Sequence, residues 1–158
     1  MVAQLEFHTG IADPLGYCCR LLRKAYRRGS KVVVCGQSER LLRLDTMLWT
    51  FEQLEFVPHA RLHGSERPDA TLLAHTPIWL ADAASPWPPA DVVVNLGEPP
   101  IEEPARFDRI IEIVGDAQAD RQAGRARWRH YVTLGLKPER PGTAASVVIA
   151  ADDAAAAP

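Results

Sequence analysis

Three unbroken apolar runs, rich in β-branched residues, constrain the fold of this chain more than any other feature. They cover residues 31–35 (KVVVC), 91–96 (DVVVNL) and 109–114 (RIIEIV). A strand without a polar face has to be buried on both sides, as in parallel sheets that are covered by helices. The runs therefore predict a mostly parallel sheet enclosed between helical layers.

Three segments next to these runs have the residue spacing and the terminal residues that are typical of helices. Asp13 and Pro14 form a cap followed by proline at the first helical position, and Gly29 ends the segment. Ser38 is a candidate cap for a second helix, and residues 116–134 are helical in character apart from Gly124. We expect one helix after each of the first two strands and a long helix after the last strand.

A short strand at residues 5–8 precedes the first helix, and an extended segment at residues 56–59 follows the second. Residues 76–80 (TPIWL) predict a short strand near a sheet edge because of Pro77. The alternation of strands and helices predicts a three-layer α/β/α sandwich with a mostly parallel, Rossmann-like sheet. We expect one domain at residues 1–140, and a disordered, Ala/Pro-rich tail at residues 141–158.

Composition excludes several classes of protein. The 158 residues carry a formal net charge of -2, which argues against a protein that coats nucleic acid but leaves a local basic patch possible. Cys18, Cys19 and Cys35 make an odd number without metal-like spacing and suit a reducing cytoplasm. We find no signal peptide and no membrane-length apolar run, so we expect a soluble cytoplasmic protein with no membrane partner.

Signals for catalysis and cofactor binding are weak. The loop at residues 9–13 has a single glycine, fits no phosphate-binding motif, and carries Asp13, which would repel a phosphate. His59 and His63 lack further metal ligands, so a loop histidine bonded to backbone is the simpler expectation. We therefore predict no catalytic residues, no metal and no cofactor. A degenerate Rossmann-like nucleotide-binding enzyme remains the alternative.

The last helix is basic and aromatic on one side. At about 100° per residue, five residues fall within roughly one quarter of its circumference. They are Arg121, Arg125, Trp128, Arg129 and Val132. Neighbouring arginines repel one another unless an anion lies between them, so this face suits an acidic partner. A simply solvated basic face is the alternative, and the net charge disfavours direct binding of single-stranded DNA. The opposite side, with Ala119, Ala123, Ala126 and His130, is predicted to dock onto the sheet.

Four segments of the chain carry a resemblance to a known family. They are residues 125–131 (RARWRHY) followed by Gly135, residues 44–49 (LDTMLW) followed by 56–59 (FVPH), residues 28–32 (RGSKV), and residues 91–96 (DVVVNL). In this order and spacing, between about residues 4 and 138, they resemble the chi subunit family of the bacterial DNA polymerase III holoenzyme.

The resemblance implies a non-catalytic accessory subunit of the clamp-loader complex, a component of the DNA-directed DNA polymerase. The family binds the acidic C-terminal tail of single-stranded DNA-binding protein, which ends in a hydrophobic residue and a free carboxylate. Matching positions for the tail are Arg121, Arg125, Trp128, Arg129 and Val114. The family also binds the psi subunit, for which the matching positions are Trp49 and Phe56. Val132 replaces a basic residue of some members, so we expect either a lower affinity for the tail or compensation by Arg127.

Overall fold

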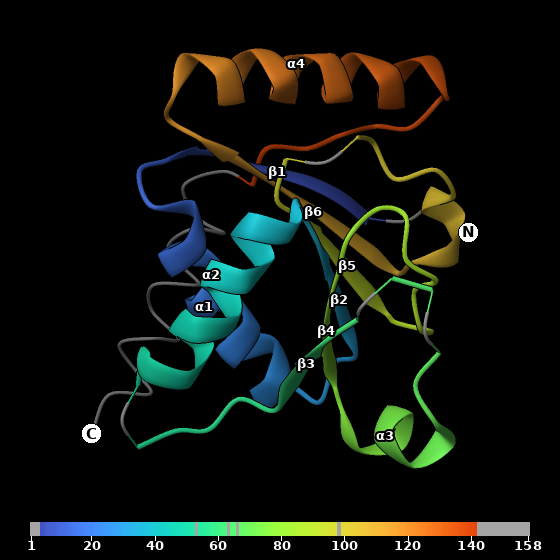
Figure 1. The fold of residues 1–158 in the computed structure, drawn as a ribbon. Helices are drawn as coiled ribbons and strands as arrows, with labels where there is room; N and C mark the ends of the chain where they lie inside the picture. Colours follow the sequence, from blue (N-terminus) through green and yellow to red (C-terminus); the bar gives the residue numbers. More distant parts are fainter. Residues whose placement is uncertain (1–3, 53, 63, 66, 98, 142–158) are drawn as a thin grey trace.

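The computed structural model describes residues 4–141 except 53, 63, 66 and 98, so most of the predicted disordered tail lies outside the described residues. Figure 1 shows the arrangement of its helices and strands. In chain order these are β1 (Gln4–Ile11), α1 (Pro14–Arg27), β2 (Val32–Cys35), α2 (Ser38–Thr50), β3 (His59–Arg61), α3 (Ala70–His75), β4 (Ile78–Ala81), β5 (Val92–Asn95), the 3-10 turn η1 (Pro104–Arg106), β6 (Arg109–Gly115) and α4 (Gln118–Thr133).

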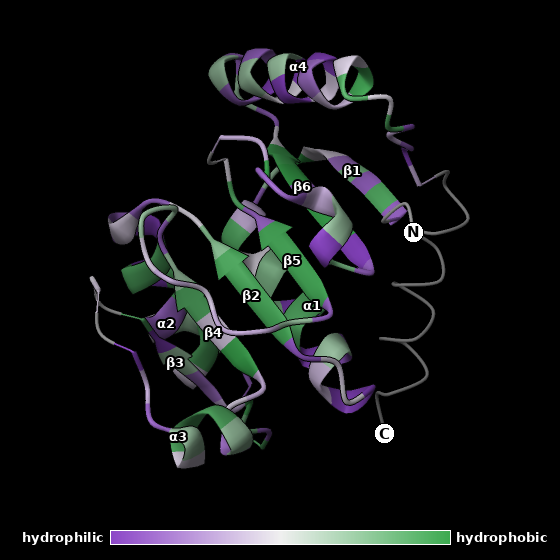
Figure 2. Ribbon diagram, turned by 90° about the vertical axis from the view of Figure 1, so that its right-hand side faces the viewer, coloured by the Kyte–Doolittle hydropathy of each residue, from purple (hydrophilic) through white to green (hydrophobic). Residues whose placement is uncertain are grey.

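The six strands form one sheet in the order β1-β6-β5-β2-β4-β3. Every pairing between these strands is parallel. In Figure 2 the central strands β2 and β5 are hydrophobic along their length, whereas the edge strand β1 carries hydrophilic segments. The parallel sheet predicted from the apolar runs is confirmed.

Helices cover both faces of the sheet. Leu22 of α1 and Leu44 of α2 belong to the cluster of buried side chains on one face. Tyr131 of α4 belongs to the cluster on the other face, together with Phe7 and Ile110. Figure 1 shows α4 lying apart from α1 and α2. The predicted three-layer α/β sandwich is confirmed, and no helix of the described residues is long and apolar enough to cross a membrane.

The start of α1 follows the predicted capping pattern. The Asp13 carboxylate accepts a hydrogen bond of 3.1 Å from the backbone N–H of Gly16, and Pro14 opens the helix. A phosphate bound after β1 would need those same N–H groups at the helix start. The carboxylate of Asp13 already occupies this position.

The short strand predicted near a sheet edge at residues 76–80 is confirmed. It is β4, the second strand from the edge, which pairs with β2 on one side and with the edge strand β3 on the other. Pro77 lies just before β4, and its carbonyl accepts a 2.9 Å hydrogen bond from Val32. A proline at this place needs no N–H to donate, so it does not exclude an interior strand. The short helix α3 had no counterpart in the predicted elements.

A buried cluster of polar side chains fastens the edge strand β1 to β6. Arg109 donates two hydrogen bonds to the Glu6 carboxylate, at 2.9 and 2.8 Å. His8 lies 2.9 Å from the same carboxylate and also contacts the Tyr17 hydroxyl. Burial alone would raise the pKa of Glu6, but the hydrogen bonds from His8 and Arg109, with the charge of Arg109, lower it to about 2.

The Glu6 cluster predicts a loss of stability in acid. Because the pKa of Glu6 falls from 4.5 in a free side chain to about 2 in the fold, its contribution is present above pH 4.5 and is lost as the pH falls toward 2. We expect Glu6 to account for a loss on the order of 2–3 kcal/mol in the free energy of unfolding. Urea unfolding of wild type and Glu6→Gln between pH 5 and 2 measures this.

The matched control for this experiment is Glu102→Gln, which changes an exposed carboxylate. Its acid dependence should follow that of the wild type. A Glu6→Gln protein that loses as much stability in acid as the wild type would contradict the expectation.

Candidate functional site

A pocket of about 600 Å³ lies between the C-terminal half of β1 and one side of α4. It is the place where the sequence-predicted tail-binding residues come together. Its lining comprises Phe7, Thr9, Gly10, Val114, Asp116, Arg121, Gly124, Arg125, Trp128, Arg129 and Arg140. All five predicted positions, from three successive turns of α4 and the end of β6, thus line one pocket.

The arginines of α4 at this pocket are exposed to solvent. Arg121, Arg125 and Arg129 form no ion pair with any carboxylate within the part of the chain that the structure describes. Asp116 is the acidic residue of the lining. An excess of unpaired guanidinium groups in one pocket favours an anionic ligand, because arginine binds carboxylates with two parallel hydrogen bonds.

The floor of the pocket is apolar and aromatic. Trp128 is half-buried and packs on Phe7, with 5.0 Å between ring centroids at 60°. Gly124 faces Val114 so closely that an added Cβ would lie 2.9 Å from both methyl carbons of the valine. The missing side chain of Gly124 therefore lets α4 approach the sheet, and it keeps Val114 at the pocket wall.

Two expectations about α4 are wrong. The alanine side was predicted to dock onto the sheet, but Ala119, Ala123 and Ala126 are exposed, and the buried residues of α4 are Gly124, Arg127 and Tyr131. Compensation for Val132 by Arg127, one of the two alternatives, is wrong because the Arg127 guanidinium is buried and paired with Glu112. Val132 itself is 50% exposed and lies outside the pocket lining.

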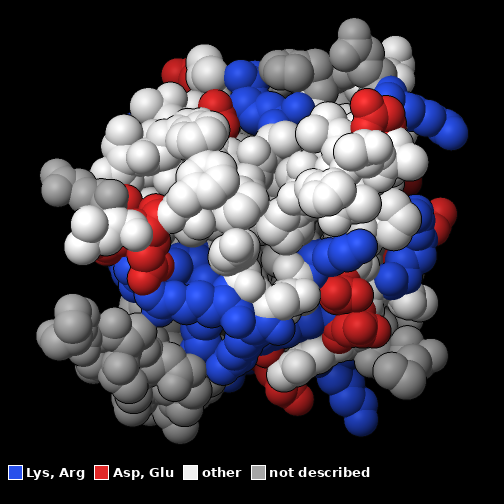
Figure 3. All heavy atoms as spheres, turned by 90° about the horizontal axis from the view of Figure 1, so that it is seen from below, with Lys and Arg blue, Asp and Glu red and all other residues white. Residues whose placement is uncertain are grey.

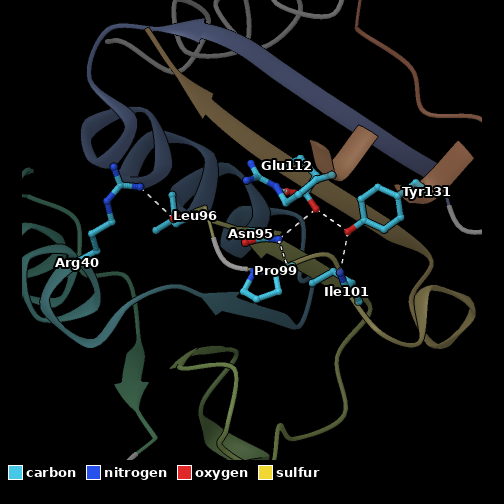
Figure 4. Close-up of polar contacts among 8 residues, drawn as sticks. Arg40, Asn95, Leu96, Pro99, Ile101, Glu112 and Tyr131 are labelled. Carbon is cyan, nitrogen blue, oxygen red and sulfur yellow. Dashed lines mark hydrogen bonds and ion pairs between the residues drawn. The ribbon is translucent and has the colours of Figure 1, made fainter. Parts of the chain in front are cut away.

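A buried polar network attaches α4 to the sheet (Figure 4). Arg127 donates through Nε to the Glu112 carboxylate at 2.9 Å, and the Tyr131 hydroxyl donates to it at 2.6 Å. Asn95 donates to the same carboxylate at 3.1 Å, and the N–H of Ile101 donates to Tyr131 at 2.8 Å. Burial raises the pKa of Glu112, while Arg127 and the hydrogen bonds oppose that rise. The network fixes the rotation of α4, and with it the side that faces the pocket.

Removing the buried cation should therefore destabilise the fold. We expect Arg127→Met to lower the free energy of unfolding by about 3–5 kcal/mol, because Glu112 loses its buried partner. Urea unfolding at neutral pH measures the change. Arg125→Met, which alters an exposed arginine of the same helix, should stay within about 0.5 kcal/mol of wild type. Equal effects of the two substitutions would contradict this role of Arg127.

The second pair of predicted residues forms a different surface at the end of α2. Trp49 and Phe56 are each 57% exposed, and their ring centroids lie 5.1 Å apart. Leu54, which is 94% exposed, lies in the same shallow depression. This exposure shows that Trp49 does not belong to the buried stripe of α2, which consists of Leu41, Leu44 and Leu48. Exposed large hydrophobic side chains that cluster in this way are typical of protein-binding surfaces.

A hydrogen bond between two of the sequence segments supports this apolar surface. His59 Nε2 lies 2.9 Å from the Asp45 carboxylate, and His59 Nδ1 lies 2.7 Å from the carbonyl of Val57. The Trp49 ring packs against the His59 ring, with 5.1 Å between centroids. The expected backbone-bonded histidine is thus confirmed at His59, whereas His63 lies outside the described residues.

Another basic surface lies on the side of the molecule away from α4, where Figure 3 shows Lys and Arg gathered in a band. The last turn of α1, which ends on this side, supplies Lys24 and Arg27. Arg27 forms an ion pair with Glu55, and Arg23 bonds to Glu52 at 3.3 Å. Carboxylates of the chain already pair with Arg23 and Arg27. The pocket beside α4 is therefore better suited than this surface to bind an external anion.

The described residues contain no cluster of three or more histidine, cysteine and acidic residues that could hold a metal ion. Cys18, Cys19 and Cys35 are all buried. Burial raises the pKa of the Cys18 thiol well above its usual value and that of Cys19 to about 11, so both are protonated near neutral pH.

Sequence reasoning missed six residues of the pocket: Phe7, Thr9, Gly10, Asp116, Gly124 and Arg140. Arg140 contributes a further guanidinium, which lies 5.9 Å from the centroid of the Trp128 ring. Arg140 lies beyond Pro138, after the end of α4, so helical periodicity cannot relate it to the other arginines. The sequence alone therefore does not place it in the pocket. The β1 residues are brought to the pocket by strand pairing alone.

The fold and the site together define a small α/β protein with a parallel sheet, a basic aromatic pocket at one sheet edge and an apolar surface on the opposite layer. The family model of the DNA polymerase III chi subunit, HolC, matches residues 2–139. DNA polymerase III subunit chi from Pseudomonas aeruginosa is 32% identical over 127 residues, which cover 76% of this chain and 82% of that protein. The chain therefore belongs to the DNA polymerase III chi subunit family.

Solved structures share the fold at low identity. The C-terminal domain of the DEAD-box protein Dbp5 has a TM-score of 0.59 and 13% identity, and the match covers 88% of this chain and 89% of that one. A DEAD box protein from the hyperthermophile Methanococcus jannaschii has a TM-score of 0.54 and 14% identity, over 88% of this chain and 41% of that one. At these identities the likeness concerns the fold alone.

Proposed function

We propose that this protein is a non-catalytic accessory subunit of the clamp-loader complex that binds the acidic C-terminal tail of single-stranded DNA-binding protein. Binding of that tail would link the replicase to coated single-stranded DNA. The observation that carries the proposal is the α4 pocket, in which guanidinium groups without carboxylate partners among the described residues surround an aromatic floor.

The chemistry of such a tail matches the two parts of the pocket. Its acidic residues and terminal carboxylate are suited to Arg121, Arg125 and Arg129, which are exposed. Its hydrophobic last residue is suited to the side of the pocket where Trp128 and Val114 lie. Arg140, beside Trp128, adds a cation at the end of the pocket that the sequence motif does not include.

A linking role requires a second, independent contact, and the apolar surface at the end of α2 is suited to it. We propose that Trp49 and Phe56 bind the psi subunit. Trp49 belongs to α2, whose buried residues pack on one face of the sheet, whereas α4 packs on the other face. Two partners could therefore be held at once, without overlap of their binding surfaces.

The tail site is tested by titration with a peptide that copies the last residues of the single-stranded DNA-binding protein from the same cell. We expect Arg125→Ala and Trp128→Ala each to weaken binding roughly tenfold, because each removes a charged hydrogen bond or apolar contact worth about 1–3 kcal/mol. Binding should also weaken with added salt. Fluorescence anisotropy of a labelled peptide gives the Kd.

The matched control is Arg43→Ala, which removes an exposed arginine from α2 and should bind the peptide like wild type. If Arg125→Ala and Trp128→Ala bind the peptide as tightly as Arg43→Ala, the pocket is not the tail site.

The second contact is tested with the psi subunit of the same cell. We expect the double variant Trp49→Ala, Phe56→Ala to lose co-purification with psi, because the exposed aromatic pair supplies most of the apolar area of this surface. Its affinity for the tail peptide should stay unchanged. The control Leu72→Ala removes an exposed leucine from α3 and should retain psi. Retention of psi by the double variant would contradict the assignment.

A further inference from the structure

The outer edge of β1 is paired along only part of its length. Gln4 donates its N–H to Asp108, on the side of β6, so the next residue presents its backbone groups outward. On that outer side, Glu139 donates to the carbonyl of Leu5 at 2.9 Å, and Phe7 donates to the carbonyl of Glu139 at 2.8 Å. Figure 1 shows the segment after α4 returning beside β1. The segment after α4 thus adds one parallel bridge, between Glu6 and Glu139.

Pro141 ends this added pairing. The next hydrogen bond of a parallel ladder would run from the N–H of residue 141 to the carbonyl of Phe7, and proline has no N–H. The alternation of the strand directs the carbonyl of Phe7 and the N–H of Thr9 to the same outer edge, just where the register of β1 against β6 shifts, between His8 and Ile11. Among the described residues, neither group forms a backbone hydrogen bond outside the sheet. An open stretch of strand edge therefore begins where Pro141 stops the ladder.

This open stretch lies inside the α4 pocket. Phe7, Thr9 and Gly10 form the β1 wall of the pocket, and Arg140 stands beside the point where the pairing ends. A strand that added itself to this edge would lie beneath the arginines of α4. Unpaired strand edges are ready sites for the addition of an extended peptide, since the main chain supplies the hydrogen bonds.

We propose that an extended acidic peptide occupies the pocket as an added strand, hydrogen-bonded to the open edge of β1 at Phe7 and Thr9 and continuing the pairing that Glu139 begins. The proposal rests on the proposed function, because it concerns how the same pocket holds the tail. Main-chain hydrogen bonds would hold the peptide in register, and the arginines of α4 would select its acidic side chains.

The charge of the pocket favours a separate acidic peptide over the chain's own residues after Pro141. The first acidic residue of that segment, Asp152, is separated from Pro141 by ten uncharged residues. At about 3.3 Å per residue in a strand, a direct continuation along β1 would carry those acids well past the short open stretch. Continuation of the chain itself would leave the arginines of α4 unneutralised.

The experiment is a backbone scan of the tail peptide, in which each variant carries one N-methyl group on a successive amide nitrogen. An added strand presents alternate N–H groups to β1, so we expect the Kd to rise roughly three- to tenfold at alternate positions and to stay near the parent value between them. A scan without this alternation, for a peptide that still needs Arg125, would overturn the strand addition and leave the proposed function intact. Failure of the parent peptide to bind wild type would overturn both.

Substitutions in the protein test the same edge. Thr9→Pro removes the proposed donor, whereas Thr9→Ala retains it, so we expect weaker peptide binding in the first variant and unchanged binding in the second. Pro141→Ala restores the missing N–H, lets the chain extend its own pairing over Phe7, and should also weaken binding. Thermal unfolding checks that each variant folds, and the peptide scan decides the question if Thr9→Pro does not.

The competing occupant is tested by a chain that ends at Pro141. We expect it to bind the peptide within about twofold of the full chain. A gain of more than tenfold on truncation would assign the strand position to residues 142–158 of the chain itself and would overturn the proposal.

Discussion

The buried ion pair between Glu112 and Arg127 is the interaction on which the site depends. It places Arg127, with Gly124 and Tyr131, at the centre of the buried side of α4. At about 100° per residue, this rotation turns the side of Arg121 and Arg125 toward the pocket beside β1 and the alanine side away from it. A different rotation of α4 would carry the same arginines into bulk solvent, away from Val114 and Phe7. The geometry of the pocket is therefore a consequence of one polar contact under the helix.

The layered sheet could be predicted from the sequence because unbroken apolar strands have few alternatives in a protein of this size. The rotation of α4 could not, because its buried side contains an arginine and a glycine rather than the apolar stripe on which such predictions depend. A signal did exist in Glu112, a carboxylate in the middle of an otherwise apolar strand. Such a residue needs a buried cationic partner, but the sequence alone does not say which of the many arginines of the chain supplies it. Arg127 fills that role, and the fourth arginine of the pocket is Arg140, from outside the helix.

The two candidate surfaces owe their independence to the sheet that separates them. Asp45 and His59 come from the two halves of one sequence motif, and their hydrogen bond holds the segment around Phe56 against α2. Trp49 packs against His59 and so remains at the surface instead of turning into the core. The residues of this motif thus divide into a supporting pair, Asp45 and His59, and an exposed pair, Trp49 and Phe56. Spacing along the chain does not distinguish these roles, because the position of Trp49 in the sequence would equally suit a buried residue at the end of α2.

The edge of β1 connects the architecture of the sheet to the pocket. An edge strand with unpaired backbone groups favours uncontrolled association, and proteins commonly cover or interrupt such edges. Here Glu139 covers the first part, and among the described residues Pro141 ends the cover before the part beside Phe7 and Thr9. Backbone groups accept any extended chain, so selectivity has to come from the side chains around them. This selectivity comes from Trp128 and from Arg121, Arg125 and Arg129, which pair with no carboxylate of the described residues. An acidic chain with an apolar residue satisfies both features, whereas a neutral or basic strand leaves the arginines repelling one another.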